Sequence, residues 1–233
     1  MNEEILIKSA ISQTSNRSDT ITIPKWTVMV YMAGDNSLSN EALDYLNELE
    51  SAGSSKNVDI IVLFDQDKVG DSHLYRILKD PKGYKPVQSS TNPDAAYDLT
   101  SPISQILDDN GIIFTGNESN MGSILTLLNF VNWTSQNYPA DRYVLILWDH
   151  GDGWQGGFCW DESDNSSYLT LGEFANALSV IKQRLGKCID ILGFDACTMA
   201  QCEVVHSVKP YVDFFIGSET LEPGDGWCYN LSF

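Results

Sequence analysis

One stretch near the end of the chain decides the fold, and it runs Lys187–Cys188–Ile189–Asp190–Ile191–Leu192–Gly193–Phe194–Asp195–Ala196–Cys197. Its segment Ile189–Leu192 is short, apolar and β-branched, which predicts a buried strand that ends at Gly193. A helical pattern with Met199 and Val204 on its apolar side follows at once. We therefore expect Cys197 where a strand turns into a helix, a position at which the helix dipole favours a thiolate.

A second apolar run, Tyr143–Trp148, predicts another strand and is followed by Asp149, His150 and Gly151. A lone thiol at a turn is most often a small packing residue, but a Cys–His pair can act as a nucleophile with its general base and acid. An oxyanion would need backbone N–H donors. Gly151, which lets the backbone approach closely, and the amide of Cys197 are the expected donors.

The rest of the chain alternates apolar runs with helical patterns. A capping-box sequence at Thr170–Glu173 opens one of these helices, and Gly186 closes it. Alternation of this kind predicts a mainly parallel sheet with helices on both faces and a ligand site at the C-terminal ends of the strands. The expected strands cover 26–33, 58–64, 143–148, 189–192 and 212–216, a hairpin pairs 74–78 with 84–87, and helices start near 38, 124 and 171.

Composition excludes some partners. The chain has 233 residues, and 14 Lys and Arg against 32 Asp and Glu give a net charge of −18, which disfavours nucleic acid and anionic membrane as partners. Five scattered Cys do not form a disulfide framework or a metal-binding spacing. Residues 1–23 are expected to be a flexible lead-in without an apolar signal region, so both an intracellular protein and a secreted one with its signal removed stay open.

The sequence resembles the clostripain family of cysteine peptidases, which belongs to the caspase-like clan. The similarity covers roughly residues 24–230, and its motifs are WTVMVYMAGDN (26–36), YPADRYVLILWDHG (138–151), the segment 169–178, DILGFDAC (190–197) and PGDGW (223–227). It implies a caspase-like three-layer sandwich over 24–233 and an endopeptidase that cleaves protein or peptide substrates after Arg or Lys. It assigns the nucleophile to Cys197, the dyad histidine to His150, and the acids of the pocket for the basic side chain to Asp195 and Asp225.

The sequence differs from the family pattern in two respects, and the family suggests one cofactor. Many members mature by cleavage at a basic residue between the His and the Cys, yet 151–181 contain no Lys or Arg. Members usually continue beyond the position of Phe233, so we expect supporting elements outside this chain. Some members need calcium, for which the loop Asp161–Glu162–Asp164 offers carboxylates; no other cofactor is implied.

Two other functions stay open. One is a catalytically inactive, caspase-like binding or scaffold module. The other is a metal-dependent hydrolase that would use Asp149, His150, Asp152 and Asp161. Simpler interpretations also exist for single residues: Asp195 as a helix cap, Asp225 as a turn residue, and Asp35 with Asn36 as a simple turn.

Overall fold

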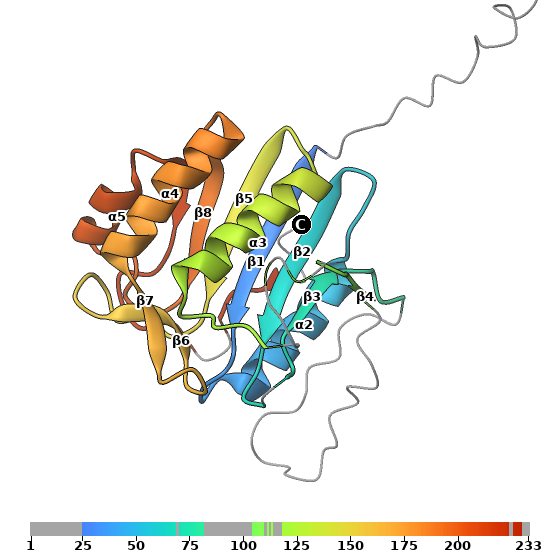
Figure 1. The fold of residues 1–233 in the computed structure, drawn as a ribbon, viewed down its shortest axis with the longest axis horizontal. Coiled ribbons are helices and arrows are strands. Elements are labelled where there is room, and N and C mark those ends of the chain that lie inside the picture. Colours follow the sequence, from blue (N-terminus) through green and yellow to red (C-terminus); the bar gives the residue numbers. More distant parts are fainter. Residues whose placement is uncertain are drawn as a thin grey trace, which may run out of the picture.

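The computed structural model describes residues 25–68, 70–81, 104–109, 111, 113, 118–223 and 226–229. Its centre is a seven-stranded sheet with the strand order β4-β3-β2-β1-β5-β8-β9 (Figure 1). A separate two-stranded hairpin, β6 and β7, lies beside it. The sheet strands are β1 (Trp26–Ala33), β2 (Val58–Asp65), β3 (His73–Arg76), β4 (Gln105–Ile106), β5 (Arg142–Trp148), β8 (Ile189–Asp195) and β9 (Val212–Ile216).

The five strands β2, β1, β5, β8 and β9 are parallel, as the sequence predicts, and β3 and β4 add an antiparallel edge. All five expected parallel strands are present. The central strand β1 is buried along almost its whole length, which explains why it is apolar at successive positions rather than at alternate ones.

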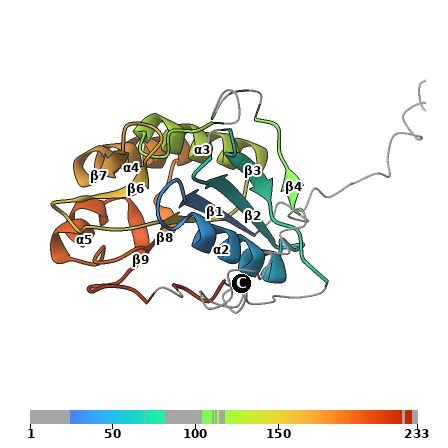
Figure 2. The ribbon, with the colours of Figure 1, turned by 90° about the horizontal axis from the view of Figure 1, so that it is seen from below.

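Helices cover both faces of the sheet, as Figure 2 shows. Helices α3 (Ile124–Asn137), α4 (Leu171–Leu185) and α5 (Cys202–Val208) pack on one face, and α2 (Ser39–Ala52) packs on the other. Alternate residues of β1 separate into the two cores, with Met29 and Tyr31 on the α3–α4 side and Val28 and Val30 on the α2 side. This architecture confirms the predicted α/β fold class. Among the described residues, no helix is both long and apolar enough to cross a membrane.

The predicted capping box at the start of α4 is confirmed. The Thr170 side chain accepts a hydrogen bond from the Glu173 amide, and the Glu173 carboxylate accepts one from the Thr170 amide. At the other end, Gly186 adopts the left-handed conformation with φ 70°. Both ends of α4 are therefore set by local sequence, which fixes where β8 begins.

Some local predictions need correction, and others cannot be tested. Gly193 does not end β8, which continues to Asp195; a Cβ atom there would lie 2.9 Å from the Trp227 ring, so the glycine makes room for that indole. The segment after β5, for which the sequence analysis gives no strand, contains the hairpin of β6 (Gly157–Asp161) and β7 (Ser167–Thr170). The expected partner at 84–87, like the lead-in at 1–23, lies outside the described residues.

Candidate active site

The register of β5 and β8 brings the two candidate catalytic loops to the same edge of the sheet. Trp148 pairs with Asp195, and the Asp149 amide donates to the Asp195 carbonyl at 3.3 Å. His150 and Cys197 each lie two residues beyond the paired positions. A Cβ atom at Gly151 would lie 2.4 Å from the Cys197 carbonyl oxygen, so the two loops touch and the contact requires glycine.

Cys197 lies in a turn rather than at a helix N-terminus, which corrects the sequence prediction. Helix α5 begins only at Cys202. Thr198 has a left-handed φ of 60°, and its hydroxyl donates to the Cys197 carbonyl at 2.8 Å. The Cys197 thiol is partly exposed, and its sulfur accepts a hydrogen bond from the Glu222 amide at 3.3 Å. The structure therefore does not place the N-terminus of a helix at Cys197, contrary to the sequence prediction.

His150 is exposed, and its ring contacts a side chain of the loop after β1. Its Nε2 lies 2.9 Å from the Ser37 hydroxyl, and partial desolvation lowers its pKa below the usual value for histidine. A neutral imidazole at neutral pH follows, which is the form that accepts a proton.

The residue before the histidine anchors its loop. Asp149 is buried, and its carboxylate accepts hydrogen bonds from the Asn36 side chain at 2.8 Å and from the Trp160 amide at 2.5 Å. Burial raises the pKa of Asp149 well above its usual range. Asn36 also donates to the carbonyls of Ala33 and Trp160, so it joins β1, the His150 loop and β6. The simple turn expected at Asn36 is therefore a buried bridge, which the sequence does not predict.

Of the two predicted pocket acids, the structure describes only Asp195, because Asp225 lies outside the described residues. Asp195 is buried at the end of β8, and its Oδ2 accepts a hydrogen bond from the Tyr229 hydroxyl at 2.8 Å. Burial, together with the adjacent carboxyl of Glu222, raises the pKa of Asp195 to about 8. The carboxylate therefore faces the segment after β9, rather than capping a helix.

Glu222 is the acid that the sequence analysis misses. Its backbone amide contacts the Cys197 sulfur, its carboxyl lies beside Asp195, and its Oε1 accepts from the Trp227 indole at 3.1 Å. One residue thus touches both the candidate nucleophile and the candidate pocket acid. The available signal was its position in an acidic loop that follows a parallel strand.

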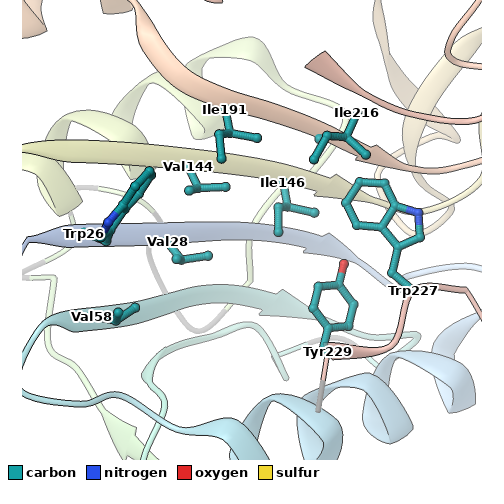
Figure 3. A pocket seen from close by; sticks show the side chains of 10 residues that line it. Trp26, Val28, Val58, Val144, Ile146, Ile191, Ile216, Trp227 and Tyr229 are labelled. Atoms are coloured by element: carbon teal, nitrogen blue, oxygen red, sulfur yellow. The ribbon is translucent and has the colours of Figure 1, made fainter. Parts of the chain in front are cut away.

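An apolar cavity of about 500 Å³ lies on the face of the sheet shown in Figure 3. Side chains such as Val28, Ile146 and Ile191 form its floor, with Trp227 and Tyr229 at the end near the C-terminal edge. Its lining contains no carboxylate among the described residues, so it does not suit a basic side chain. Trp227 and Tyr229 nevertheless connect this cavity to the acid pair, since they hydrogen-bond Glu222 and Asp195.

The acids proposed for a metal-dependent hydrolase do not converge. Asp149 is engaged by Asn36 and Trp160, whereas Asp161 belongs to a different cluster. In that cluster, carboxylate oxygens of Asp35, Asp65 and Asp161 all lie within 4.8 Å of one another. No histidine of the described part of the chain joins it, and neither do Glu162 and Asp164 of the expected calcium loop. Burial raises the pKa of Asp65 to about 8 and that of Asp161 to about 6.

Comparison with known proteins points to one family. The model of the clostripain family matches residues 30–233. Clostripain from Hathewaya histolytica is 27% identical to this chain over an alignment of 245 residues, and the alignment covers 96% of this chain and 44% of clostripain.

Two solved structures have the same fold. A secreted C11 cysteine protease from Bacteroides thetaiotaomicron, in complex with an irreversible peptide inhibitor, superposes with a TM-score of 0.67 at 27% identity over 89% of this chain and 52% of that one. An inactive zymogen C11 protease from Parabacteroides distasonis gives 0.64 at 25% identity over 90% and 52%. This chain spans about half the length of these relatives. The match to the family model and the shared fold together show that the chain belongs to the clostripain family.

Proposed function

We propose that this protein is a cysteine endopeptidase in which Cys197 is the nucleophile and His150 is the general base and acid. The observation that supports this most strongly is the register of β5 and β8, which brings the His150 and Cys197 loops into contact at one edge of the sheet. The partly exposed thiol and the lowered pKa of His150 suit these roles.

The chemistry would follow two steps. His150 takes the Cys197 proton, the sulfur attacks the scissile carbonyl, and the imidazolium gives that proton to the leaving amine, which leaves a thioester. Water, deprotonated by His150, then attacks the thioester and releases the acid and the free thiol. The Ser37 contact at 2.9 Å occupies Nε2, so Nδ1 would be the nitrogen that exchanges the proton. The amides of Gly151 and Cys197 are the proposed donors to the oxyanion.

Substrates in this proposal are proteins or peptides with Arg or Lys at the cleaved position. The buried Asp195, with Glu222 beside it, offers negative charge next to the nucleophile. The net charge of −18 favours the approach of cationic peptides.

Fluorogenic peptides with Arg, Lys or Asp before the scissile bond test this function directly. Hydrolysis of the Arg and Lys peptides separates a peptidase from an inactive scaffold module. Two treatments separate the thiol mechanism from a metal-dependent hydrolase. A thiol peptidase should lose its activity to iodoacetamide but keep it in the presence of a chelator, with calcium restored in a separate assay.

Removing the imidazole should slow the chemistry rather than weaken binding. We expect His150→Ala to lower kcat by about 10²- to 10⁴-fold with little change in KM, because proton transfer belongs to the transition state. Burial lowers the pKa of His150, so the acid limb of the wild-type kcat should lie below about 6.5, since the imidazole accepts a proton only in its neutral form. Steady-state kinetics across pH measure both effects. A variant that changes only KM would instead assign His150 to substrate binding.

The chain should act without a cut between His150 and Cys197. Residues 151–181 lack Lys and Arg, and there the chain forms the β6–β7 hairpin and the packed helix α4. Of the three basic residues in 182–187, two are engaged, since Lys182 donates to the Pro210 carbonyl at 2.7 Å and Lys187 pairs with Asp190 at 2.7 Å. We expect the intact mass to persist during activity, or a cut only within 182–187. Mass spectrometry against a Cys197→Ala control tests this, and a self-made cut within 151–181 would refute it.

A further inference from the structure

The segment that follows β9, residues 217–223, lies along the turn after β8, and we call this segment the strap. Two backbone hydrogen bonds join the strap to the turn. The Thr198 amide donates to the Thr220 carbonyl at 2.8 Å, and the Ala200 amide donates to the carbonyl of Ser218 at 2.8 Å. The turn benefits from this support, because Thr198 has a left-handed φ of 60°, which is unfavourable for a residue with a β-carbon. The strap therefore helps to fix the backbone that directly follows the candidate nucleophile.

Near the end of the strap, the backbone amide of Glu222 donates to the candidate nucleophile. Its nitrogen lies 3.3 Å from the Cys197 sulfur. Pro223 restricts the residue before it to extended conformations, so few backbone arrangements of Glu222 compete with this one. The Trp227 indole donates to the Glu222 carboxylate at 3.1 Å, and the same indole packs against Gly193 of β8. Pro223 and Trp227 together therefore hold the Glu222 amide against the sulfur.

We propose that Glu222 is a positioning residue whose backbone N–H aims the Cys197 sulfur and stabilises its thiolate form. This inference rests on the proposed function, in which Cys197 is the nucleophile. The thiolate is the reactive form of a cysteine, and a hydrogen-bond donor favours the charged sulfur over the neutral one. The helix that the sequence predicts at this position begins only at Cys202. The strap therefore provides, from a different element, an N–H group of the kind that a helix N-terminus was expected to provide.

The Glu222 amide exchanges no proton in this scheme. When His150 takes the proton of the thiol, the sulfur becomes negative, and the Glu222 N–H donates to that charge. When the sulfur then attacks the scissile carbonyl carbon, the negative charge moves to the carbonyl oxygen. The Glu222 amide therefore acts before the attack, whereas the amides of Gly151 and Cys197 are the proposed donors after it.

The rate at which iodoacetamide alkylates Cys197 tests this role without any peptide hydrolysis. Glu222→Pro removes the N–H donor and should slow the alkylation about 10- to 100-fold at about pH 6.5. At about pH 10 a cysteine is ionised with or without a donor, so the difference between the two chains should nearly vanish. The same pattern is expected in the background of His150→Ala, because the donor acts without the imidazole. Peptide mass spectrometry measures the alkylation of Cys197 separately from that of the other cysteines.

Matched variants separate the loss of the donor from other effects of the substitution. Glu222→Gln keeps the N–H and an oxygen that can accept from the Trp227 indole, so it should be alkylated at the parent rate. Leu221→Pro places the same ring at an exposed residue of the strap and should also keep the parent rate. If a thermal melt shows that Glu222→Pro does not fold, Trp227→Phe takes its place. That variant removes the indole donor to Glu222 and should show a smaller loss with the same pH dependence.

The outcomes that overturn the donor role differ from those that overturn the peptidase. The proposal is wrong if Glu222→Pro is alkylated at the parent rate at about pH 6.5, or if its loss is equal at about pH 10. The same criteria apply to Trp227→Phe where it is the variant used. A parent chain that hydrolyses no peptide, while Glu222→Pro shows the pH-dependent loss, would refute the proposed function and leave the donor role in place.

Discussion

Replacing Cys197 with Ala is expected to abolish peptide hydrolysis, with a fall in kcat on the order of 10⁶-fold. Cys197 is the partly exposed cysteine whose loop touches the His150 loop, since its carbonyl approaches Gly151. Cys159 also lies near that loop, next to the Phe158 that pairs with Gly151, but it is buried, and Cys188 contacts Pro210. Removing one sulfur from a partly exposed turn leaves no core cavity, so the Tm should change little. Hydrolysis of an arginyl reporter and a thermal melt of the same sample measure both effects.

Cys202→Ala is the matched control, because this cysteine is exposed at the start of α5 and its sulfur contacts Glu203. It should retain full activity. An irreversible peptide ketone with a terminal Arg gives a second readout, since mass spectrometry should find it on Cys197 in the parent chain and in Cys202→Ala. Loss of activity in Cys202→Ala with activity retained in Cys197→Ala would overturn the assignment of the nucleophile.

The fold was predictable because its signals are local. The burial of β1 on both faces appears as an unbroken apolar run, and the capping box of α4 needs only Thr170 and Glu173. The prediction that the strand ends at Gly193 was wrong because the role of this glycine depends on a residue far along the chain. It accommodates the indole of Trp227, which follows β9, and no periodicity within β8 can reveal a neighbour so far along the chain.

Only those residues of the site that directly follow the ends of the parallel strands could be predicted from the sequence. In a parallel sheet, His150 and Cys197 had to reach the same edge, and they do. Asn36, Glu222 and the cluster of Asp35, Asp65 and Asp161 depend instead on which loops pack together. Side chains of this kind become visible only when three elements are placed in space.

The second large effect concerns specificity. A guanidinium that enters a partly desolvated pocket needs a carboxylate partner, and losing one member of a buried charge pair costs about 2–5 kcal/mol. We therefore expect Asp195→Asn to lower kcat/KM for Arg peptides by roughly 30- to 4000-fold. The Tyr229 hydroxyl can still donate to the new amide oxygen, so the fold should survive. A peptide library varied at the position before the scissile bond measures the change.

The pH dependence makes this prediction specific. Burial and the adjacent Glu222 raise the pKa of Asp195 to about 8, so the empty pocket holds a proton at neutral pH. A bound cation stabilises the ionised form and must displace that proton, which is harder at lower pH. KM for Arg peptides should therefore fall as pH rises from about 6 to about 8 in the parent chain. Asp195→Asn has no such proton and should lose this dependence.

Two further variants distinguish a specific acidic pocket from the general negative electrostatic field of the protein. Asp152→Asn removes an exposed acid from the His150 loop and should leave the preference for Arg intact. Asp225→Asn should have an effect comparable to or smaller than that of Asp195→Asn. Arg would exceed Lys because its guanidinium can bond a carboxylate with two N–H groups. A parent chain that prefers acidic or apolar residues, or an Asp195→Asn chain with full Arg activity, would refute the pocket while leaving the Cys197–His150 proposal untouched.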